Sequence, residues 1–206
     1  MIMSFIKKYI LPKEVDFIAA LNQHISIITK ITNDLYECFI NCKKDSCDSI
    51  LNDVYHEKQM REKNMRELLS TFITPIDRES IYRVITQLDW IAISIKHFTL
   101  EAKAYEIRKL EYTDIIKGIQ LQAQLLSSGF KTIKSSPSNT TQSAQKVRDA
   151  YNGVVSLYVK KMAKLANSKD MKEVFMHKEL LNQLKEISKR MQMCANSLED
   201  IVMKMS

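Results

Sequence analysis

The strongest constraint on the fold is the spacing of apolar side chains in residues 171–205, the last long segment of the chain. Apolar residues recur there at alternating intervals of 4 and 3, which places them on one face of a helix. Such a face is typical of helices that pack in an antiparallel bundle. The positions are Leu180, Leu184, Ile187, Met191, Cys194, Leu198, Ile201 and Met205.

Turn-forming residues are scarce, since the chain holds three Gly and three Pro in 206 residues. Typical proteins contain about 7% Gly and about 5% Pro. Because a sheet protein needs many turns, this composition favours long helices with few connections. The hydrophobic content of 45% is enough for a buried core. We therefore predict an all-α fold, an up-and-down bundle of long helices.

The apolar spacing predicts six helices, and their order favours two tandem three-helix bundles. The chain is then a single domain, 1–206, with a first half at 1–108 and a second half at 109–206. The polar segment KSSPSNTTQS at 134–143 is the clearest predicted linker. A single helix over 77–127 is an alternative to separate third and fourth helices. The predicted helices run from after Pro12 to about Lys44, then over 47–72, 77–107, 114–132, 142–167 and 171–205.

The expected compartment is the cytoplasm. The first residues, MIMSFIKKYILPKEV, contain an apolar stretch that is too short and too charged for a secretory signal. No run of about 18 apolar residues is present, so no membrane-spanning helix is predicted.

The cysteines are interpreted as reduced side chains. Cys38, Cys42, Cys47 and Cys194 lack the spacing of a disulfide framework. Cys38, Cys42 and Cys47 with His56 match no standard zinc spacing, and Cys38 and Cys42 share a helix face. We expect these two to be small packing residues.

Catalytic residues are not indicated. His24, His97 and His177 stand singly on predicted helices and are interpreted as surface or boundary residues. Trp90 is interpreted as a core residue. A Gly-rich phosphate loop and a Ser/His/Asp constellation are both lacking. The sequence therefore predicts neither an enzyme nor a cofactor.

The formal net charge is +7, and residues 145–206 hold 12 Lys or Arg against 7 Asp or Glu. Lysines such as Lys160, Lys161, Lys164 and Lys169 are spaced around a predicted helix. The ordinary interpretation is a solvated helix face; the alternative is attraction to an anionic surface, either lipid headgroups or nucleic acid. Nucleic acid is disfavoured, because no recognised binding motif is present. A membrane contact would be peripheral at most.

The middle of the chain, TFITPIDRESIYRVITQLD at 71–89, carries a family resemblance. Its proline ends the preceding helix, and the following aspartate can cap the next one. The segment resembles the PhoU-like family of phosphate-transport regulators, in the branch described as accessory proteins of inorganic phosphate (Pit-type) permeases. The segments at 5–24 and 195–204 resemble the family's opening and closing helices. The matching residues of the middle motif are Thr74, Pro75, Asp77, Arg78 and Ile81.

This resemblance implies tandem three-helix bundles in a cytoplasmic regulator that is not an enzyme. The implied partner is a phosphate permease or an associated signalling protein, and a homodimer is a further option. The resemblance therefore predicts a non-enzymatic accessory protein of inorganic phosphate transport that acts through protein–protein contacts. The alternatives are a helical structural or dimerisation module, and a peripheral binder of an anionic surface through the basic C-terminal third.

Many PhoU-like proteins carry acidic pairs spaced i and i+4 on four helices, where they can hold metal ions. Of the eight corresponding positions here, only Asp89 is acidic, and Lys58 and Lys189 would repel a cation. We therefore predict that the chain lacks such metal clusters. The corresponding positions are Val54 and Lys58, Asp89 and Ile93, Tyr151 and Val155, and Lys189 and Met193.

Polar residues interrupt the apolar stripe of the second predicted helix at Glu57, Arg61 and Asn64. They can form a buried polar network or line a partner-binding groove. The simpler interpretation is a helix rotated so that this face is exposed to water.

Overall fold

The computed structural model describes residues 15–74, 76–107 and 111–205 of the chain. These residues contain six helices and no strand, which confirms the predicted all-α class. None of the described helices is long and apolar enough to cross a bilayer. The helices are α2 (Phe17–Phe39), α3 (Lys44–Ser70), α4 (Arg78–Ala104), α5 (Thr113–Thr132), α6 (Pro137–Leu165) and α7 (Met171–Met205).

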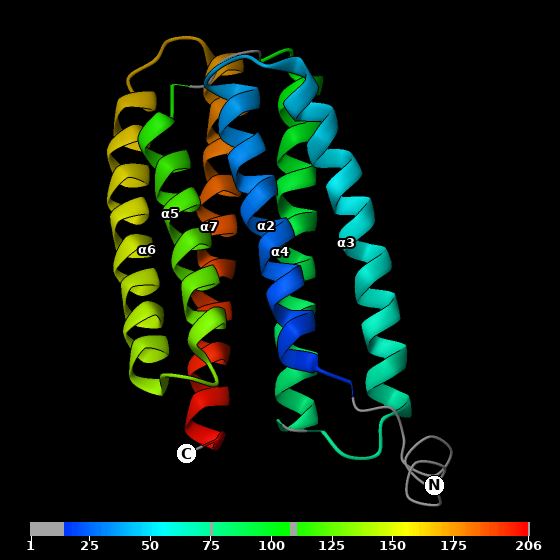
Figure 1. Ribbon diagram of the computed structural model, residues 1–206. Coiled ribbons are helices and arrows are strands. Elements are labelled where there is room, and N and C mark those ends of the chain that lie inside the picture. Colours follow the sequence, from blue (N-terminus) through cyan, green and yellow to red (C-terminus); the bar gives the residue numbers. More distant parts are fainter. Residues whose placement is uncertain (1–14, 75, 108–110, 206) are drawn as a thin grey trace, which may run out of the picture.

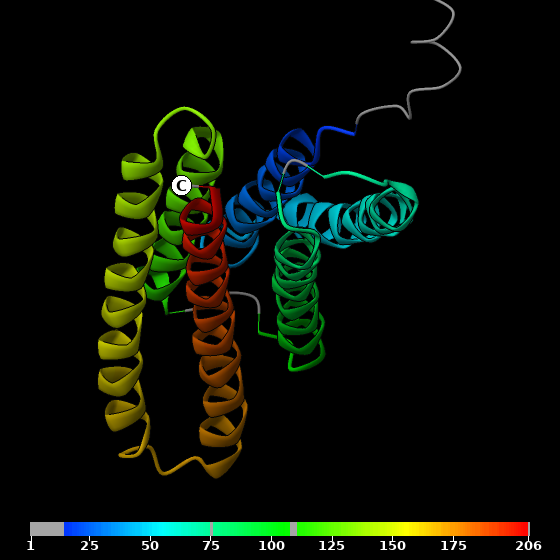
Figure 2. The same cartoon turned by 90° about the horizontal axis from the view of Figure 1, so that it is seen from below.

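The helices run alternately up and down and form two three-helix bundles side by side (Figures 1 and 2). In the first bundle α2, α3 and α4 contact one another, and in the second α5, α6 and α7 do so. Contacts of α4 with α7 and of α2 with α5 join the two bundles. The predicted tandem arrangement is thus confirmed. The predicted boundary between the halves falls at 108–109, outside the described residues, and stays a prediction.

One continuous apolar core runs through both bundles. Every helix contributes buried apolar residues, and the largest of the fully buried side chains are Phe17, Phe98 and Phe130. Met205, the last residue of the predicted stripe of α7, is 43% exposed, and Phe72, just after α3, is 86% exposed. Each lies at or beyond the last turn of its helix, where no neighbouring helix covers it.

Aspartates begin three of the helices. The carboxylate of Asp16 accepts hydrogen bonds from the N–H groups of Ile18 and Ala19, at 3.1 and 3.0 Å. Asp77 and Asp170 cap α4 and α7 in the same way. Such caps satisfy backbone donors that lack a partner in the first helical turn.

The linker predicted at 134–143 is wrong over most of its length, because α6 already begins at Pro137. Proline is favourable in the first helical turn, where its missing N–H would have no helical partner in any case. Thr140, inside the predicted linker, is fully buried, and its hydroxyl lies 3.0 Å from that of Thr132 on α5.

The alternative of one continuous helix over 77–127 is also wrong. α4 ends at Ala104, and α5 begins at Thr113. Glu106 adopts a φ of 60°, in the left-handed region, which stops the α-helical path. The N–H of Ile107 then donates to the carbonyl of Ala102 at 3.0 Å, as in a helix C-cap.

Candidate functional site

A hydrogen-bonded pair of ionisable side chains is buried between α2 and α3. The Nδ1 atom of His24 lies 2.6 Å from Oε1 of Glu57, and both side chains are 0% exposed. The surface or boundary position expected for His24 is therefore wrong. Glu57 replaces an aliphatic residue on the stripe of α3 because the imidazole across the helix interface supplies its hydrogen-bond partner.

Asn64, two turns further along α3, completes the pairing of the imidazole. Its Nδ2 atom lies 2.9 Å from Nε2 of His24. Since an amide nitrogen donates, Nε2 accepts, and the proton of a neutral imidazole is on Nδ1 and is donated to Glu57. The two α3 residues thus fix the tautomer and orientation of His24.

Asp89 on α4 extends this arrangement to the third helix of the bundle. Its Oδ2 atom lies 3.2 Å from Nε of Arg61, without the alignment of a hydrogen bond. Burial, and after it the neighbouring Glu57 carboxylate, raise the pKa of Asp89 to about 6, against the opposing effects of Arg61 and His24. We call His24, Glu57, Arg61, Asn64 and Asp89 the polar cluster.

Arg61 connects the polar cluster to the surface. Its side chain is 32% exposed, and it lines a groove of about 850 Å³ between α3 and the start of α4. The groove carries both charge signs as well as apolar groups. Its walls are Arg61, Glu62, Met65, Arg66, Leu68, Leu69, Asp77, Arg78, Glu79 and Tyr82.

The turn between α3 and α4 closes one end of this groove. Asp77 accepts hydrogen bonds from the N–H and hydroxyl of Ser80 and from Lys204 of α7. The Ser80 hydroxyl and the Lys204 ammonium lower the pKa of Asp77 to about 2. Arg78 donates to the carbonyl of Thr71 at the end of α3. The motif residues Asp77 and Arg78 thus hold the turn together.

Of the three other predicted motif residues, Ile81 is fully buried in the core. Thr74 is half-buried in the turn, and Pro75 lies outside the described residues. Beside them the turn presents a strongly exposed apolar patch. Leu69, Phe72 and Ile73 are 79%, 86% and 77% exposed. The groove and this patch are adjacent, since Leu69 belongs to both.

The structure shows a close likeness to known proteins. No protein-family model matches the chain. A PhoU-like protein from Shewanella oneidensis MR-1 matches 91% of this chain and 99% of its own, with a TM-score of 0.73 and 13% identity. This chain has a PhoU-like fold. The resemblance inferred from the sequence is therefore confirmed at the level of the fold.

Two further proteins are similar to this chain over most of its length. A second Shewanella oneidensis MR-1 protein, provisionally assigned as a PhoU-like phosphate regulatory protein, matches with a TM-score of 0.70 and 12% identity over the same shares of both chains. UPF0111 protein YkaA of Bacillus subtilis strain 168 is 26% identical over 188 residues, covering 86% of this chain and 92% of YkaA. The likeness thus extends over nearly the whole chain.

The positions that correspond to PhoU-like acidic pairs differ in their surroundings. Asp89 is buried in the polar cluster, and Val54 is buried in the core. Lys58, Lys189 and Met193 are exposed. Among the described residues no group of three or more His, Cys, Asp or Glu is arranged to hold a metal ion. Ile93, Tyr151 and Val155 are half-buried.

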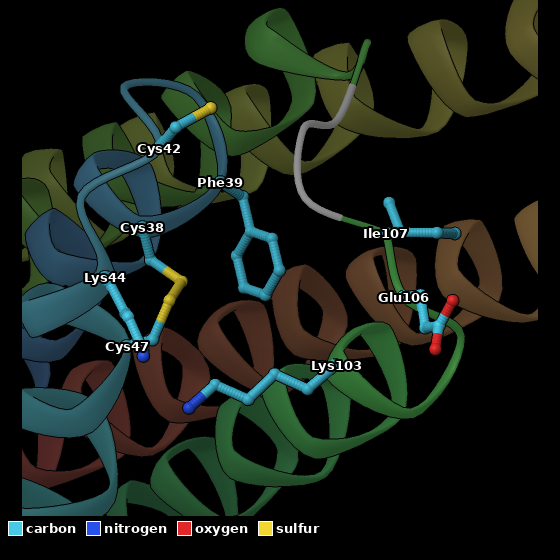
Figure 3. Close-up of a pocket in the computed structure, with 8 residues that line it drawn as sticks. All are labelled: Cys38, Phe39, Cys42, Lys44, Cys47, Lys103, Glu106 and Ile107. Atoms are coloured by element: carbon cyan, nitrogen blue, oxygen red, sulfur yellow. A yellow bond between two sulfur atoms is a disulfide. The ribbon is translucent and has the colours of Figure 1, made fainter.

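The interpretation of Cys38 as a reduced packing residue is wrong. Cys38 at the end of α2 and Cys47 in the first turn of α3 form a disulfide, with their Cα atoms 5.1 Å apart. The disulfide lines a pocket of about 670 Å³ together with Phe39 and, from the end of α4, Lys103 (Figure 3). Cys42 lies in the turn itself, exposed, with a φ of 57°. The tight turn brings two cysteines nine positions apart within bonding range.

The core position predicted for Trp90 is also wrong, since this side chain is 47% exposed. It lies off the buried stripe of α4, between Leu88 and Ile91. The guanidinium of Arg190 on α7 lies 5.0 Å from the ring centroid, a cation–π contact that covers one face of the indole. Of the other predicted surface histidines, His97 is exposed, and His177 is half-buried with Nδ1 2.5 Å from the hydroxyl of Tyr112.

A second buried polar centre, in the other bundle, was not singled out from the sequence. Gln122 on α5 is fully buried and donates to the carbonyls of Val147 on α6 and Ser188 on α7, both at 3.2 Å. The Ser188 hydroxyl donates back to Gln122 Oε1 at 2.5 Å. A glutamine on an otherwise apolar stripe was the available signal. In each bundle, therefore, buried polar side chains of the described residues join all three helices.

Proposed function

We propose that this chain is a regulatory or accessory protein of inorganic phosphate transport that works in the cytoplasm by contact with another protein. The observation that carries the proposal is the match of nearly the whole chain to two PhoU-like structures, one of them provisionally assigned as a phosphate regulatory protein. The motif turn supports it, because Asp77 and Arg78 hold the α3–α4 turn in shape. The partner we propose is a phosphate permease, of the Pit type implied by the sequence resemblance, or a signalling protein associated with one.

The contact surface we propose is the α3–α4 groove with the neighbouring patch of Leu69, Phe72 and Ile73. Interface centres combine exposed apolar residues with arginine, and this surface has Arg61, Arg66 and Arg78 beside the patch. Arg61 reaches from the groove to buried Asp89. An acidic side chain of the partner that bound Arg61 would compete with Asp89 for the guanidinium. Binding would therefore change contacts inside the first bundle.

Contact rather than catalysis is favoured by the burial of the His–carboxylate pair. A His24–Glu57 pair could in principle transfer protons, but both side chains are completely buried. A substrate would have to separate α2 from α3 to reach them. The pair is better suited to fixing the packing of the bundle.

Photo-cross-linking in the native host tests the proposal. A photoreactive amino acid in place of Phe72 should cross-link to a phosphate permease or its signalling partner, while the same replacement of Phe175, at the other end of the molecule, should not. Deletion of the chain should change the uptake of labelled phosphate, and Leu69→Ser with Phe72→Ser should reproduce that change. Unchanged uptake in the deletion strain, with no transport protein among the cross-linked products, would exclude the proposed function.

The same variants distinguish binding of another protein from dimerisation of this chain. If the patch serves dimerisation, Leu69→Ser with Phe72→Ser should halve the mass of the purified protein in sedimentation equilibrium. An unchanged mass with a lost permease cross-link is the outcome expected from the proposal.

A further inference from the structure

The tip of the molecule where α6 ends and α7 begins, residues 159–178, exposes three apolar side chains. Val159 is 57% exposed, Met171 is 74% exposed and Phe175 is 65% exposed. Met171 and Phe175 are separated by four residues in the first turns of α7, so they project from the same helix face. This tip lies at the end opposite to the α3–α4 turn and the C-terminus (Figure 1).

Positive charge surrounds these apolar side chains. Residues 159–178 contain six lysines against two acids, Asp170 and Glu173. Some lysines elsewhere, such as Lys30 and Lys103, are ion-paired with aspartates. The exposed lysines of the tip have no ion pair within the part of the chain that the structure describes; they are Lys160, Lys164, Lys169, Lys172 and Lys178.

Two acids of the tip, Asp170 and Glu173, are used within the turn itself, and a third, Glu111 before α5, lines a pocket with Lys161 and Lys164. Asp170 caps α7 by accepting hydrogen bonds from the N–H groups of Lys172 and Glu173, at 2.9 and 3.1 Å. Glu173 accepts a hydrogen bond from the hydroxyl of Ser168 at 3.0 Å. The carboxylates of Asp170 and Glu173 therefore face the backbone of the turn and the Ser168 hydroxyl. The exposed lysine ammonium groups remain available to bind an external anion.

We propose that this tip docks on an anionic lipid membrane, with the lysines at the headgroup phosphates and Met171 and Phe175 inserted at the edge of the acyl chains. Lysines attract anionic lipids, and apolar side chains beside them add the hydrophobic part of interfacial binding. The long lysine stems can extend to the headgroups while the apolar side chains enter deeper. The inference does not rest on the proposed function, because it uses a different surface.

A membrane fits this surface better than nucleic acid or an acidic protein. Single-stranded nucleic acid is bound by several aromatic side chains stacking along a basic groove, and of the three exposed apolar residues only Phe175 offers a stacking face. An acidic protein would match the lysines but would leave Met171 and Phe175 against charged groups. A bilayer supplies both an anionic layer and an apolar layer within a few ångströms.

Co-sedimentation with lipid vesicles tests the inference. The full chain should sediment with vesicles of equal parts phosphatidylglycerol and phosphatidylcholine, should stay in solution with phosphatidylcholine alone, and should be released by added salt as screening increases. Lys164→Glu, Lys169→Glu and Lys172→Glu together should weaken binding at least about tenfold. The charge-matched control is Lys63→Glu, Lys131→Glu and Lys146→Glu, three exposed lysines toward the opposite end of the molecule, which should weaken it far less.

Insertion of the apolar side chains has a separate readout. Phe175→Trp in a Trp90→Phe background leaves one tryptophan, whose emission should shift to the blue with phosphatidylglycerol vesicles only. Met171→Ser with Phe175→Ser should weaken binding, while Leu69→Ser with Phe72→Ser at the opposite end should not. Equal binding to both vesicle types, no binding to either, or equal losses from the tip and control variants would overturn the proposal, as would retention on DNA without retention on vesicles.

Discussion

The Nδ1 atom of His24 lies 2.6 Å from Oε1 of Glu57, in a contact between α2 and α3 from which water is excluded. Asn64 holds the other imidazole nitrogen, and Asp89 adds a second carboxylate from α4. A bundle of three helices can slide or rotate while keeping apolar contacts. This directional pairing fixes one register among them.

Removing the acceptor should strongly destabilise the fold. Glu57→Leu leaves the Nδ1–H of His24 buried without a partner, and the free energy of unfolding should fall by about 2–4 kcal/mol. Urea denaturation followed by circular dichroism measures the loss. Glu62→Gln, on an exposed position of the same helix, is the control and should change the value by less than about 0.5 kcal/mol. A loss from Glu57→Leu no larger than that of the control would contradict the role given to the pair.

The stability of the fold should depend on pH through Asp89. Its pKa is about 6 in the fold against 3.8 for an unperturbed aspartate, so ionisation is disfavoured by folding. The stability that the fold gains from keeping Asp89 protonated is therefore fully present below pH 3.8, and it is lost as the pH rises through about 6. Asp89→Asn should remove this loss, with a difference from wild type that grows by about 2 kcal/mol across the window. Urea unfolding of both proteins between those limits measures it, and parallel curves would show that Asp89 does not titrate there.

Reduction of the Cys38–Cys47 disulfide should weaken the α2–α3 turn. A cross-link between cysteines nine positions apart lowers the entropy of the unfolded chain, which corresponds to about 2–3 kcal/mol. Peptide mapping without reductant should find the cross-linked peptide, and dithiothreitol should lower the unfolding midpoint. Cys38→Ala with Cys47→Ala is the control in which dithiothreitol should have no effect. An equal response to dithiothreitol in both proteins would count against the bond.

The polar centre of the second bundle should contribute less to the free energy of unfolding than that of the first. Ser188→Ala removes the hydroxyl that donates to Gln122 Oε1, and the free energy of unfolding should fall by about 1–2 kcal/mol. Ser156→Ala, on an exposed position of α6, is the control. The same urea experiment applies, and no difference between the two variants would mean that Gln122 is satisfied without Ser188.

The sequence predicted the helices well because apolar spacing is a local property. The stripe of α7 is buried from Leu180 to Ile201, as its intervals require. The polar cluster depends on which residues of different helices face each other, which local spacing does not encode. His24 was therefore misplaced, although Glu57 and Asn64 on an apolar stripe were a signal that a polar partner lay opposite. Trp90 was predicted to be buried because it is aromatic, although it lies off the apolar face of its helix. Pro137 was assigned to a linker because it is a proline, although proline is favourable in the first turn of a helix.

The continuous core has a consequence for cooperativity. Because α4 packs on α7 and α2 packs on α5, each bundle covers an apolar face of the other. Unfolding one bundle would expose that face of its neighbour, so both should melt in a single transition with equal calorimetric and van't Hoff enthalpies. A destabilising substitution of His24 in the first bundle should then lower the hydrogen-exchange protection of α5 and α7 as well as that of α2. A local substitution would thus lower the stability of both bundles.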